Sequence, residues 1–246
     1  MPLLTIWYYF CLVRFNFYES MKYFKFFLPA LILFSFTSCI EIIDDVTVKN
    51  DGSGTMKYTI NLSASKVKIN SILALDSLNG KKVPSKDEVE TKIASFVRKM
   101  KTKTGISNVQ MVKSDMIEFI FKFQCDFTSV AALQTALKEV IEEEIEDKNI
   151  KELDHKWMSW DGQKLIRSIP DVTIEKTKEL KPEDIELLKT GNYTSITRFE
   201  RAVDRFDNAN AELSQNKLAV MIKTNPYLLS QNYSLLENTI YLTPSK

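Results

Sequence analysis

An apolar run near the start of the chain constrains most strongly how and where this protein folds. Residues 26–36 form an eleven-residue hydrophobic segment that only Pro29 and Ser35 interrupt, and two lysines lie in the five residues before it. Eleven residues of helix cover about 16 Å, whereas the hydrocarbon core of a bilayer is roughly 30 Å thick. The layout therefore predicts a secretory signal and not a membrane-spanning helix.

The residues that end this run add a more specific signal. The stretch Phe36-Thr37-Ser38-Cys39 resembles the lipobox of bacterial lipoproteins, in which small residues precede the cysteine that closes the hydrophobic segment. In that family a diacylglycerol is attached to the cysteine sulfur, and a dedicated signal peptidase cuts before it. Phe36 departs from the leucine that the family favours there. The resemblance implies lipidation of Cys39 and a signal peptide over residues 21–38. An ordinary signal peptide with an incidental cysteine is the alternative.

Residues 1–20 do not fit this scheme. They contain a second apolar run over residues 3–13, which is followed by Arg14 and Glu19 and is again too short to cross a bilayer. We interpret this stretch as an upstream extension, with synthesis starting at Met21, so that the leader covers residues 1–38. An unusually long leader is the alternative.

The expected attachment to the membrane is through lipid alone. One acyl chain binds a bilayer only marginally, whereas two chains give stable attachment, and a diacylated Cys39 supplies two. No linker rich in Ser, Gly or Pro separates Cys39 from the first predicted strand, which starts at Glu41, so we expect the folded body close to the bilayer. Taken whole, the chain resembles lipoproteins of Gram-negative bacteria with AT-rich genomes. This implies the periplasmic face of the outer membrane, with surface exposure as the alternative.

Composition excludes several classes of partner and cofactor. The 33 Lys and Arg residues balance 32 Asp and Glu residues, so no charge excess attracts nucleic acid. One His and three Cys argue against a zinc site or a disulfide framework. The sequence also lacks the glycine-rich loops that bind nucleotides. We therefore expect no metal, no cofactor and no nucleic-acid partner.

Hydrophobic periodicity predicts an α+β fold with antiparallel sheet hairpins and packed helices. The clearest element is a hairpin of strands 41–49 and 55–63 around a turn at residues 50–54, although Asp44 falls on the apolar face of the first strand. Further strands are predicted over residues 109–112, 116–124, 193–200, 218–224 and 239–242, with a hairpin over residues 156–168. Helices are predicted over residues 65–78, 85–100, 128–144, 181–191 and 226–231, the second of them with a capping box at Ser85 and Glu88.

The mature chain divides into two candidate lobes. Charge peaks over residues 147–154, which suggests an N-terminal α+β lobe over residues 39–150 and a mixed C-terminal lobe over residues 151–246. One continuous domain is the alternative.

Four side chains are candidate functional residues. His155 is the only imidazole, but a catalytic triad needs an orienting carboxylate, and the adjacent Asp154 would face the other side of a strand. Cys125 continues an apolar strand register, which favours core packing. Trp157 and Trp160 lie three positions apart, so a regular strand turns them to opposite faces. One is expected in the core, and the other is a candidate exposed contact with lipid, glycan or protein.

A run of acidic residues over 142–147 raises the question of a calcium site. Successive helix positions diverge by about 100°, so few of these carboxylates converge, and a solvated helix end is the simpler interpretation.

Two functions from different classes remain open. The first is a non-catalytic binding or assembly module, held near the membrane, that meets an envelope protein or polymer. The second is a periplasmic or surface hydrolase in which carboxylates such as Asp44, Asp45 or Glu118 converge, since hydrolysis by paired carboxylates needs no histidine.

Overall fold

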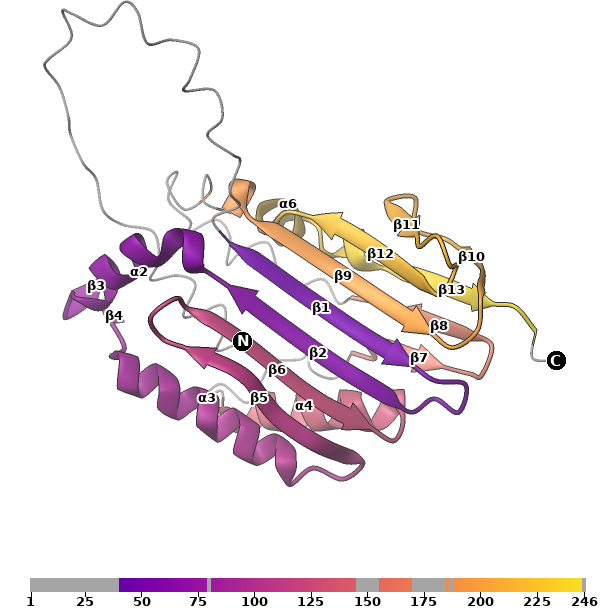
Figure 1. Ribbon diagram of the computed structural model, residues 1–246, viewed down its shortest axis with the longest axis horizontal. Helices are drawn as coiled ribbons and strands as arrows, with labels where there is room; N and C mark the ends of the chain where they lie inside the picture. The colour runs from indigo at the N-terminus through magenta and orange to yellow at the C-terminus, as the bar shows by residue number, and fades with distance from the viewer. Residues whose placement is uncertain (1–39, 79–80, 145–154, 170–184, 186–187, 245–246) are drawn as a thin grey trace, which may run out of the picture.

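A seven-stranded sheet forms the largest layer of the protein. The computed structural model describes residues 40–78, 81–144, 155–169, 185 and 188–244. In spatial order the strands of the large sheet are β11 (Ala211–Leu213), β12 (Ala219–Thr224), β9 (Asn192–Phe199), β1 (Glu41–Val48), β2 (Gly54–Asn61), β6 (Ile120–Phe127) and β5 (Ile106–Asp115). The predicted hairpin of residues 41–63 is thus confirmed as β1 and β2, and it lies at the centre of the sheet (Figure 1).

A smaller sheet packs behind the large one. Its strands, in spatial order, are β10 (Val203–Phe206), β13 (Asn238–Leu242), β8 (Lys164–Arg167) and β7 (Met158–Trp160). β7 and β8 form the predicted hairpin around Gly162, whose φ of 92° suits glycine. A two-stranded ribbon of β3 (Ser77–Leu78) and β4 (Lys81–Lys82) completes the described strands.

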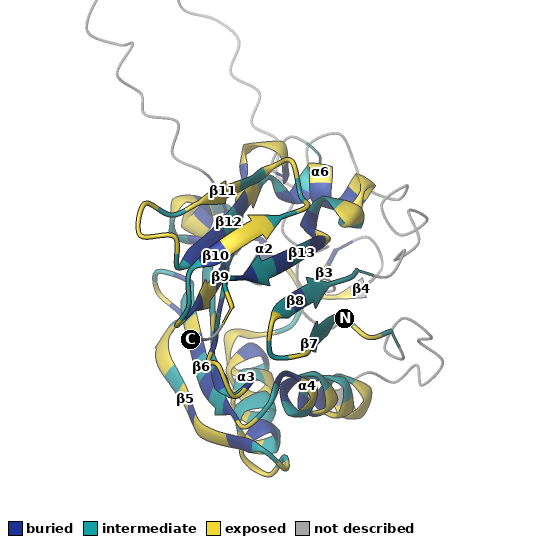
Figure 2. Cartoon of the chain, turned by 90° about the vertical axis from the view of Figure 1, so that its right-hand side faces the viewer, coloured by how far each residue is buried: buried dark blue, intermediate teal, exposed yellow. Residues whose placement is uncertain are grey.

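The helices cover one face and one end of the large sheet. They are α2 (Lys66–Leu73), α3 (Lys86–Lys101), α4 (Val130–Glu144) and α6 (Pro226–Gln231), with 3-10 turns η1 (Ser63–Ser65) and η4 (Tyr233–Leu236). α3 packs against β5 and α4, and α4 packs against β7. In the side view, α3, α4 and the smaller sheet lie on the same side of the large sheet (Figure 2). Within the described residues, no helix is both long and apolar enough to cross a bilayer.

The core fills the space between these layers. Alternate residues of the central strands face it, among them Val46, Val48 and Cys125. From the opposite side α4 contributes Leu133, and the smaller sheet contributes Leu165. Each fully buried aliphatic side chain contributes about 1.5–3 kcal/mol to folding, so this inward-facing register fixes which face of β1 and β2 is covered.

The centre of the large sheet joins distant parts of the chain. β1 runs antiparallel to β2 but parallel to β9, with Glu41 opposite Asn192 and Val48 opposite Phe199. Strands from residues 39–150 and from residues 151–246 are therefore hydrogen-bonded side by side. The fold class is α+β as predicted, with antiparallel hairpins and this one parallel pairing inside the large sheet.

Two predicted elements are wrong in part. The strand expected over residues 116–124 begins only at Ile120, because the Asp115 carboxylate accepts the N–H groups of Ile117 (3.0 Å) and Glu118 (2.8 Å) and folds the chain into a turn. The helix expected over residues 65–78 ends at Leu73. The leader, the acidic residues after Glu144 and most of the helix expected at 181–191 lie outside the described residues.

Candidate functional site

A buried polar network lies between the two sheets. Asp44 faces the core from β1, where its neighbours across the sheet are Tyr58 on β2 and Ser195 on β9. Arg167 reaches it from β8, with Nη2 at 2.5 Å from Asp44 Oδ2 and Nη1 at 2.6 Å from Ser195 Oγ. The Tyr193 hydroxyl donates a second hydrogen bond to Asp44 Oδ2 at 3.2 Å. The carboxylate is therefore held by groups from two other strands, β8 and β9.

Burial and charge shift the protonation equilibria in this network. Burial raises the pKa of Tyr193 well above its ordinary value, and the Asp44 carboxylate raises it further. Burial alone lowers the pKa of Arg167, but the adjacent Asp44 and Tyr193 outweigh it, so the guanidinium stays charged. Asp44 and Arg167 form a buried ion pair between β1 and β8. It acts as a polar clamp between the sheets.

The three candidate carboxylates for hydrolysis, Asp44, Asp45 and Glu118, do not converge. Asp45 faces the opposite side of β1 from Asp44, where Arg198 binds it through Nε and Nη2 at 2.9 and 3.1 Å. Glu118 lies in the β5–β6 turn, 2.8 Å from Lys66 Nζ. Neighbouring residues on a strand point to opposite faces, so the proposed pairing of these carboxylates in one cleft is wrong.

His155 and Cys125 both have structural surroundings. His155 Nε2 lies 3.0 Å from Ser168 Oγ at the open end of the β7–β8 hairpin, and its carbonyl accepts a hydrogen bond from Gln134 on α4. Cys125 is fully buried in the main core, where burial, followed by Asp126, raises the pKa of its thiol to about 12. The core assignment of Cys125 is confirmed.

The two tryptophans are both partly buried. Trp160 stacks on Phe199, with ring centroids 6.2 Å apart, and packs against the main core. A Cβ on Gly52 would lie 2.7 Å from Trp160 Cδ1, so the turn between β1 and β2 needs a glycine there. The Trp157 carbonyl accepts a hydrogen bond from Ser168 N–H at 2.9 Å. An exposed contact through Trp157 or Trp160 stays a prediction.

A shallow depression lies between the end of α2, β4 and the start of α3. Its volume is about 530 Å³, and Lys82 and Glu88 line it as an ion pair with Nζ 2.7 Å from Oε1. The Lys82 ammonium, together with the backbone N–H of Ser85, lowers the pKa of Glu88 to about 2. No group of three or more His, Cys, Asp or Glu side chains that could hold a metal occurs in the part of the chain that the structure describes.

The end of the large sheet where β1 begins is closely packed around Ile40. Ile40 is buried, and its carbonyl accepts a hydrogen bond from Asn192 N–H at 2.6 Å. Ile40 therefore already belongs to the fold, directly before β1 begins at Glu41. Cys39 itself lies outside the described residues.

Sequence reasoning missed Arg167 and Tyr193. The available signal was Asp44 itself, a charged residue at an inward-facing position of a clear strand. A buried carboxylate needs a cation or several donors, but nothing in the sequence indicates that the partner lies 123 residues away.

Comparisons with known proteins give one structural likeness. No family model matches the chain, and no curated protein matches it either. The folded domain of the LppM protein of Mycobacterium tuberculosis is similar with a TM-score of 0.38 and 11% identity, over 84% of this chain and 91% of that one.

Proposed function

We propose that this protein is a lipid-anchored lipoprotein of the cell envelope that serves as a non-catalytic binding or assembly module close to the membrane. One observation carries the proposal. The hydrophobic leader ends at Cys39, and the fold starts at the very next residue, the buried Ile40. A diacylated sulfur at this position places the described body directly at the bilayer surface.

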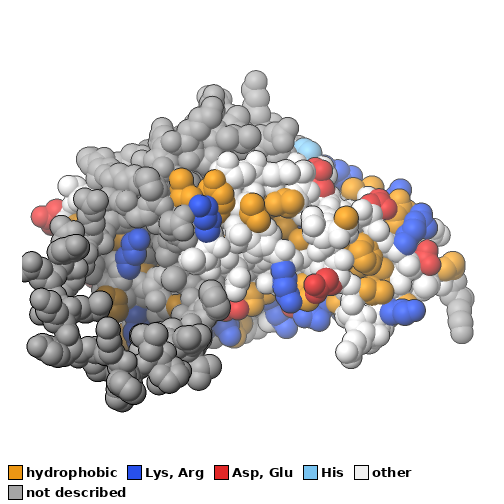
Figure 3. Space-filling view, turned by 90° about the horizontal axis from the view of Figure 1, so that it is seen from above, with side chains coloured by type: hydrophobic (Ala, Val, Ile, Leu, Met, Phe, Trp, Pro, Cys, Tyr) orange, Lys and Arg blue, Asp and Glu red, His pale blue; other side chains and the backbone are white. Residues whose placement is uncertain are grey.

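The arrangement of titratable groups supports a non-catalytic role. Asp44, Asp45 and Glu118 each pair with a separate cation on a different part of the fold. Enzymes hold such groups together in a cleft and shift their pKa values toward the task. The broad outer face of the large sheet is a better candidate for contact with an envelope protein or polymer. Seen from above, the described surface mixes hydrophobic, basic and acidic side chains (Figure 3).

The location we propose is the periplasmic face of the outer membrane. This location is proposed from the leader and its likeness to lipoprotein signals, because no feature of the described residues indicates a membrane or a face. Fractionation of inner and outer membranes, with protease digestion of intact cells, tests the membrane and the face separately.

Mass spectrometry of the mature N-terminus tests the anchor. We expect the chain to begin at Cys39 with the mass of a diacylglycerol on the sulfur, and to partition into the detergent phase. A Cys39→Ser variant should lose the lipid and leave the membrane fraction. Cys125→Ala is the matched control, because its sulfur is buried in the core, and it should keep the lipid. An unmodified Cys39 in the mature protein would falsify the proposal.

A further inference from the structure

Large hydrophobic side chains gather on the surface at one end of the molecule. Among the described residues, six are exposed: Val67, Leu75, Val112, Ile117, Leu213 and Leu228. Four of them belong to α2, the segment after it, the β5–β6 turn and α6. The most exposed are Ile117 and Val67, at 77% and 76%. A scatter of single apolar residues is ordinary, whereas a gathering at one end calls for a physical reason.

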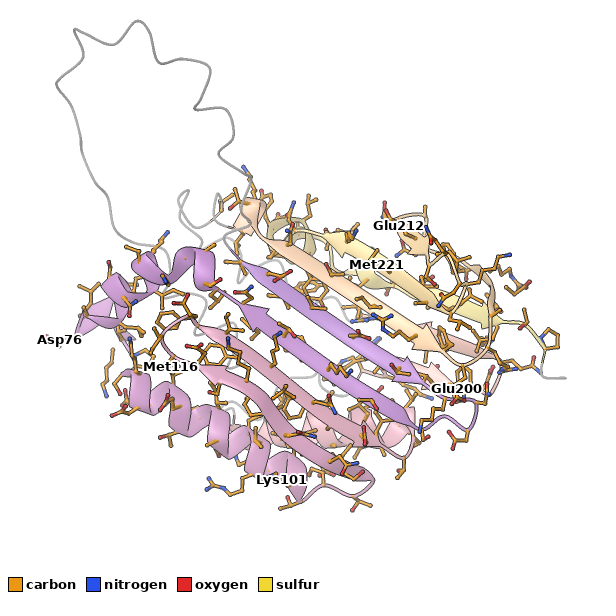
Figure 4. The ribbon with its side chains drawn as sticks, viewed as in Figure 1. Asp76, Lys101, Met116, Glu200, Glu212 and Met221 are labelled. Carbon is orange, nitrogen blue, oxygen red and sulfur yellow. The ribbon has the colours of Figure 1, made fainter. Side chains whose placement is uncertain are left out.

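Strand register places these elements at the same end. Glu41 at the start of β1 lies opposite Asn61 at the end of β2 and Asn192 at the start of β9. Asn61 in turn lies opposite Ile120, which follows the β5–β6 turn. In Figure 4, Met116 and Asp76 lie at this end, while Lys101 and Glu200 lie toward the other.

The residue after the proposed anchor touches the elements that carry the exposed side chains. Ile40 packs in one cluster with Ile69 of α2 and with Met116 and Phe119 of the β5–β6 turn. An ion pair between Lys66 and Glu118 also ties α2 to that turn. On the other side, Gly191 brings Ile40 close to α6. A Cβ there would lie 3.0 Å from Pro226 Cδ and 3.4 Å from Ile40 Cβ.

We propose that Val67, Leu75, Ile117 and Leu228 form a membrane-contact surface that inserts into the headgroup region of the bilayer around the acylated Cys39. The inference rests on the proposed lipid anchor. We assign lipid as the occupant because the acyl chains are attached to the residue directly before the buried Ile40. A linker of that length cannot lift this end away from the bilayer. The membrane-contact surface therefore meets lipid whenever the protein is anchored, and burying its side chains there is favourable.

Contact at this end also sets the orientation of the body. The strands of the large sheet run from the membrane-contact surface toward the β1–β2 turn and Glu200 (Figure 4). With the membrane-contact surface in lipid, the end at the β1–β2 turn projects away from the bilayer. A probe placed at each end then reports a different environment.

Depth-dependent fluorescence tests the surface on the lipidated full-length protein in vesicles of phosphatidylethanolamine and phosphatidylglycerol. Ile117→Cys and Glu200→Cys variants are labelled with a polarity-sensitive fluorophore. Cys125 stays unlabelled because its side chain is fully buried, and burial also raises the pKa of its thiol. We expect emission from position 117 to shift to the blue and to be quenched by brominated lipid, and emission from position 200 to do neither.

The outcomes separate this inference from the proposed function. A blue shift at 117 without quenching by brominated lipid means that protein, either a second copy or a partner, covers the site, and it overturns the inference. Equal quenching at both positions, or none at either, overturns it as well. Mass spectrometry of the same sample shows whether Cys39 is acylated. A lipidated chain without quenching at 117 refutes only the membrane-contact surface, whereas an unlipidated chain refutes the anchor and the inference together.

Matched substitutions test the same surface through the rate of protein transfer between vesicles. Leu228→Asn should speed transfer about tenfold, since it removes one apolar side chain from the interface. Leu213→Asn is its control, because Leu213 is a similarly exposed leucine on β11. Val67→Asn and Val112→Asn form a second pair, with Val112 on β5. Equal rates within both pairs contradict the proposal.

Discussion

Asp44 is a charged residue in a register that is otherwise aliphatic. Val46 and Val48 follow it on the inner face of β1, and both are buried in the main core. The carboxylate is tolerated because Arg167 neutralises it and Tyr193 donates to it. A buried ion pair gains little net stability over a good apolar pair, but removal of one partner leaves an uncompensated charge. The network therefore links β8 of the small sheet to β1 of the large sheet.

Replacement of Asp44 by Asn tests this clamp. The substitution keeps the shape of the side chain but leaves the buried Arg167 guanidinium without a counter-charge. We therefore expect a loss of about 3 kcal/mol in the free energy of unfolding. Asp45→Asn is the matched control, since its partner Arg198 is about half exposed, and should cost less than about 1 kcal/mol. Urea denaturation of the Cys39→Ser chain measures both. Equal losses from the two variants contradict a buried clamp.

Cys125 makes stability depend on pH in the alkaline range. Burial raises the pKa of its thiol from 9.0 to about 12, so above pH 9 the unfolded chain releases a proton that the folded chain keeps. The contribution of this thiol is complete below pH 9 and is lost as the pH rises toward 12, by about 1.4 kcal/mol per pH unit.

A Cys125→Ala variant isolates that contribution. Between pH 9 and 11 its urea midpoint should fall less steeply than that of the parent chain. Tyr193 remains in both proteins, and its raised pKa gives both an alkaline loss of the same sign. Parallel pH profiles for the parent and the variant would show that the thiol does not titrate as its burial implies.

At the scale of elements, local patterns in the sequence located most of the secondary structure. The alternation in residues 55–63 gave β2, and the capping box placed the start of α3 correctly. Ser85 Oγ accepts Glu88 N–H at 3.1 Å, and Glu88 Oε2 accepts Ser85 N–H at 2.7 Å. Both signals arise within a few residues, so the sequence carries them directly.

The errors arose where local and distant interactions compete. Residues 117, 119, 121 and 123 alternate like a strand, but Asp115 turns the chain, and Phe119 adopts a φ of 55° within that turn. Ile117 is therefore exposed while Phe119 is buried. Alternation also shows which face of a strand is apolar, but it does not show which strand lies beside it. The parallel pairing of β1 with β9 could therefore not be predicted.

At the scale of elements, we predict that removal of the α3 cap destabilises the fold. Ser85→Ala removes the hydrogen bond to Glu88 N–H and should cost about 1 kcal/mol of unfolding free energy. Ser71→Ala in α2 is the control, because its hydroxyl bonds only the Val67 carbonyl four residues back and alanine favours helix. Thermal unfolding followed by circular dichroism compares them. A control as destabilised as Ser85→Ala would contradict the cap.

For the whole molecule, the order of strands matters more than any single contact. β1 takes β2 from its own part of the chain and β9 from the other part, and Arg167 adds a polar link between the sheets. Cys39, the proposed site of membrane attachment, lies two residues before β1 begins at Glu41. The proposed anchor therefore adjoins the strand that lies at the centre of the sheet and carries Asp44, so a disturbance of β1 affects all three.

We propose that residues 39–150 and 151–246 fold as one cooperative unit. The chain after Cys39 has its tryptophans, Trp157 and Trp160, in the second segment and its buried thiol, Cys125, in the first. In urea, tryptophan fluorescence and thiol reactivity of the Cys39→Ser chain should therefore change with one midpoint.

A truncated chain gives the stricter test of that unit. Residues 39–150 alone lack β9, which pairs with β1 from Glu41 to Val48, and they lack every strand of the smaller sheet. β1 then keeps only β2 as a partner, and Val46 and Val48 lose the core contacts that residues such as Leu165 and Phe199 supply. Each aliphatic side chain uncovered in this way costs about 1.5–3 kcal/mol, so a few of them equal the whole stability of a small domain. We expect this fragment to show no cooperative urea transition, with the chain of residues 39–246 as the control. A fragment that unfolds cooperatively, or separate midpoints for tryptophan and thiol in the longer chain, would instead establish two independent lobes.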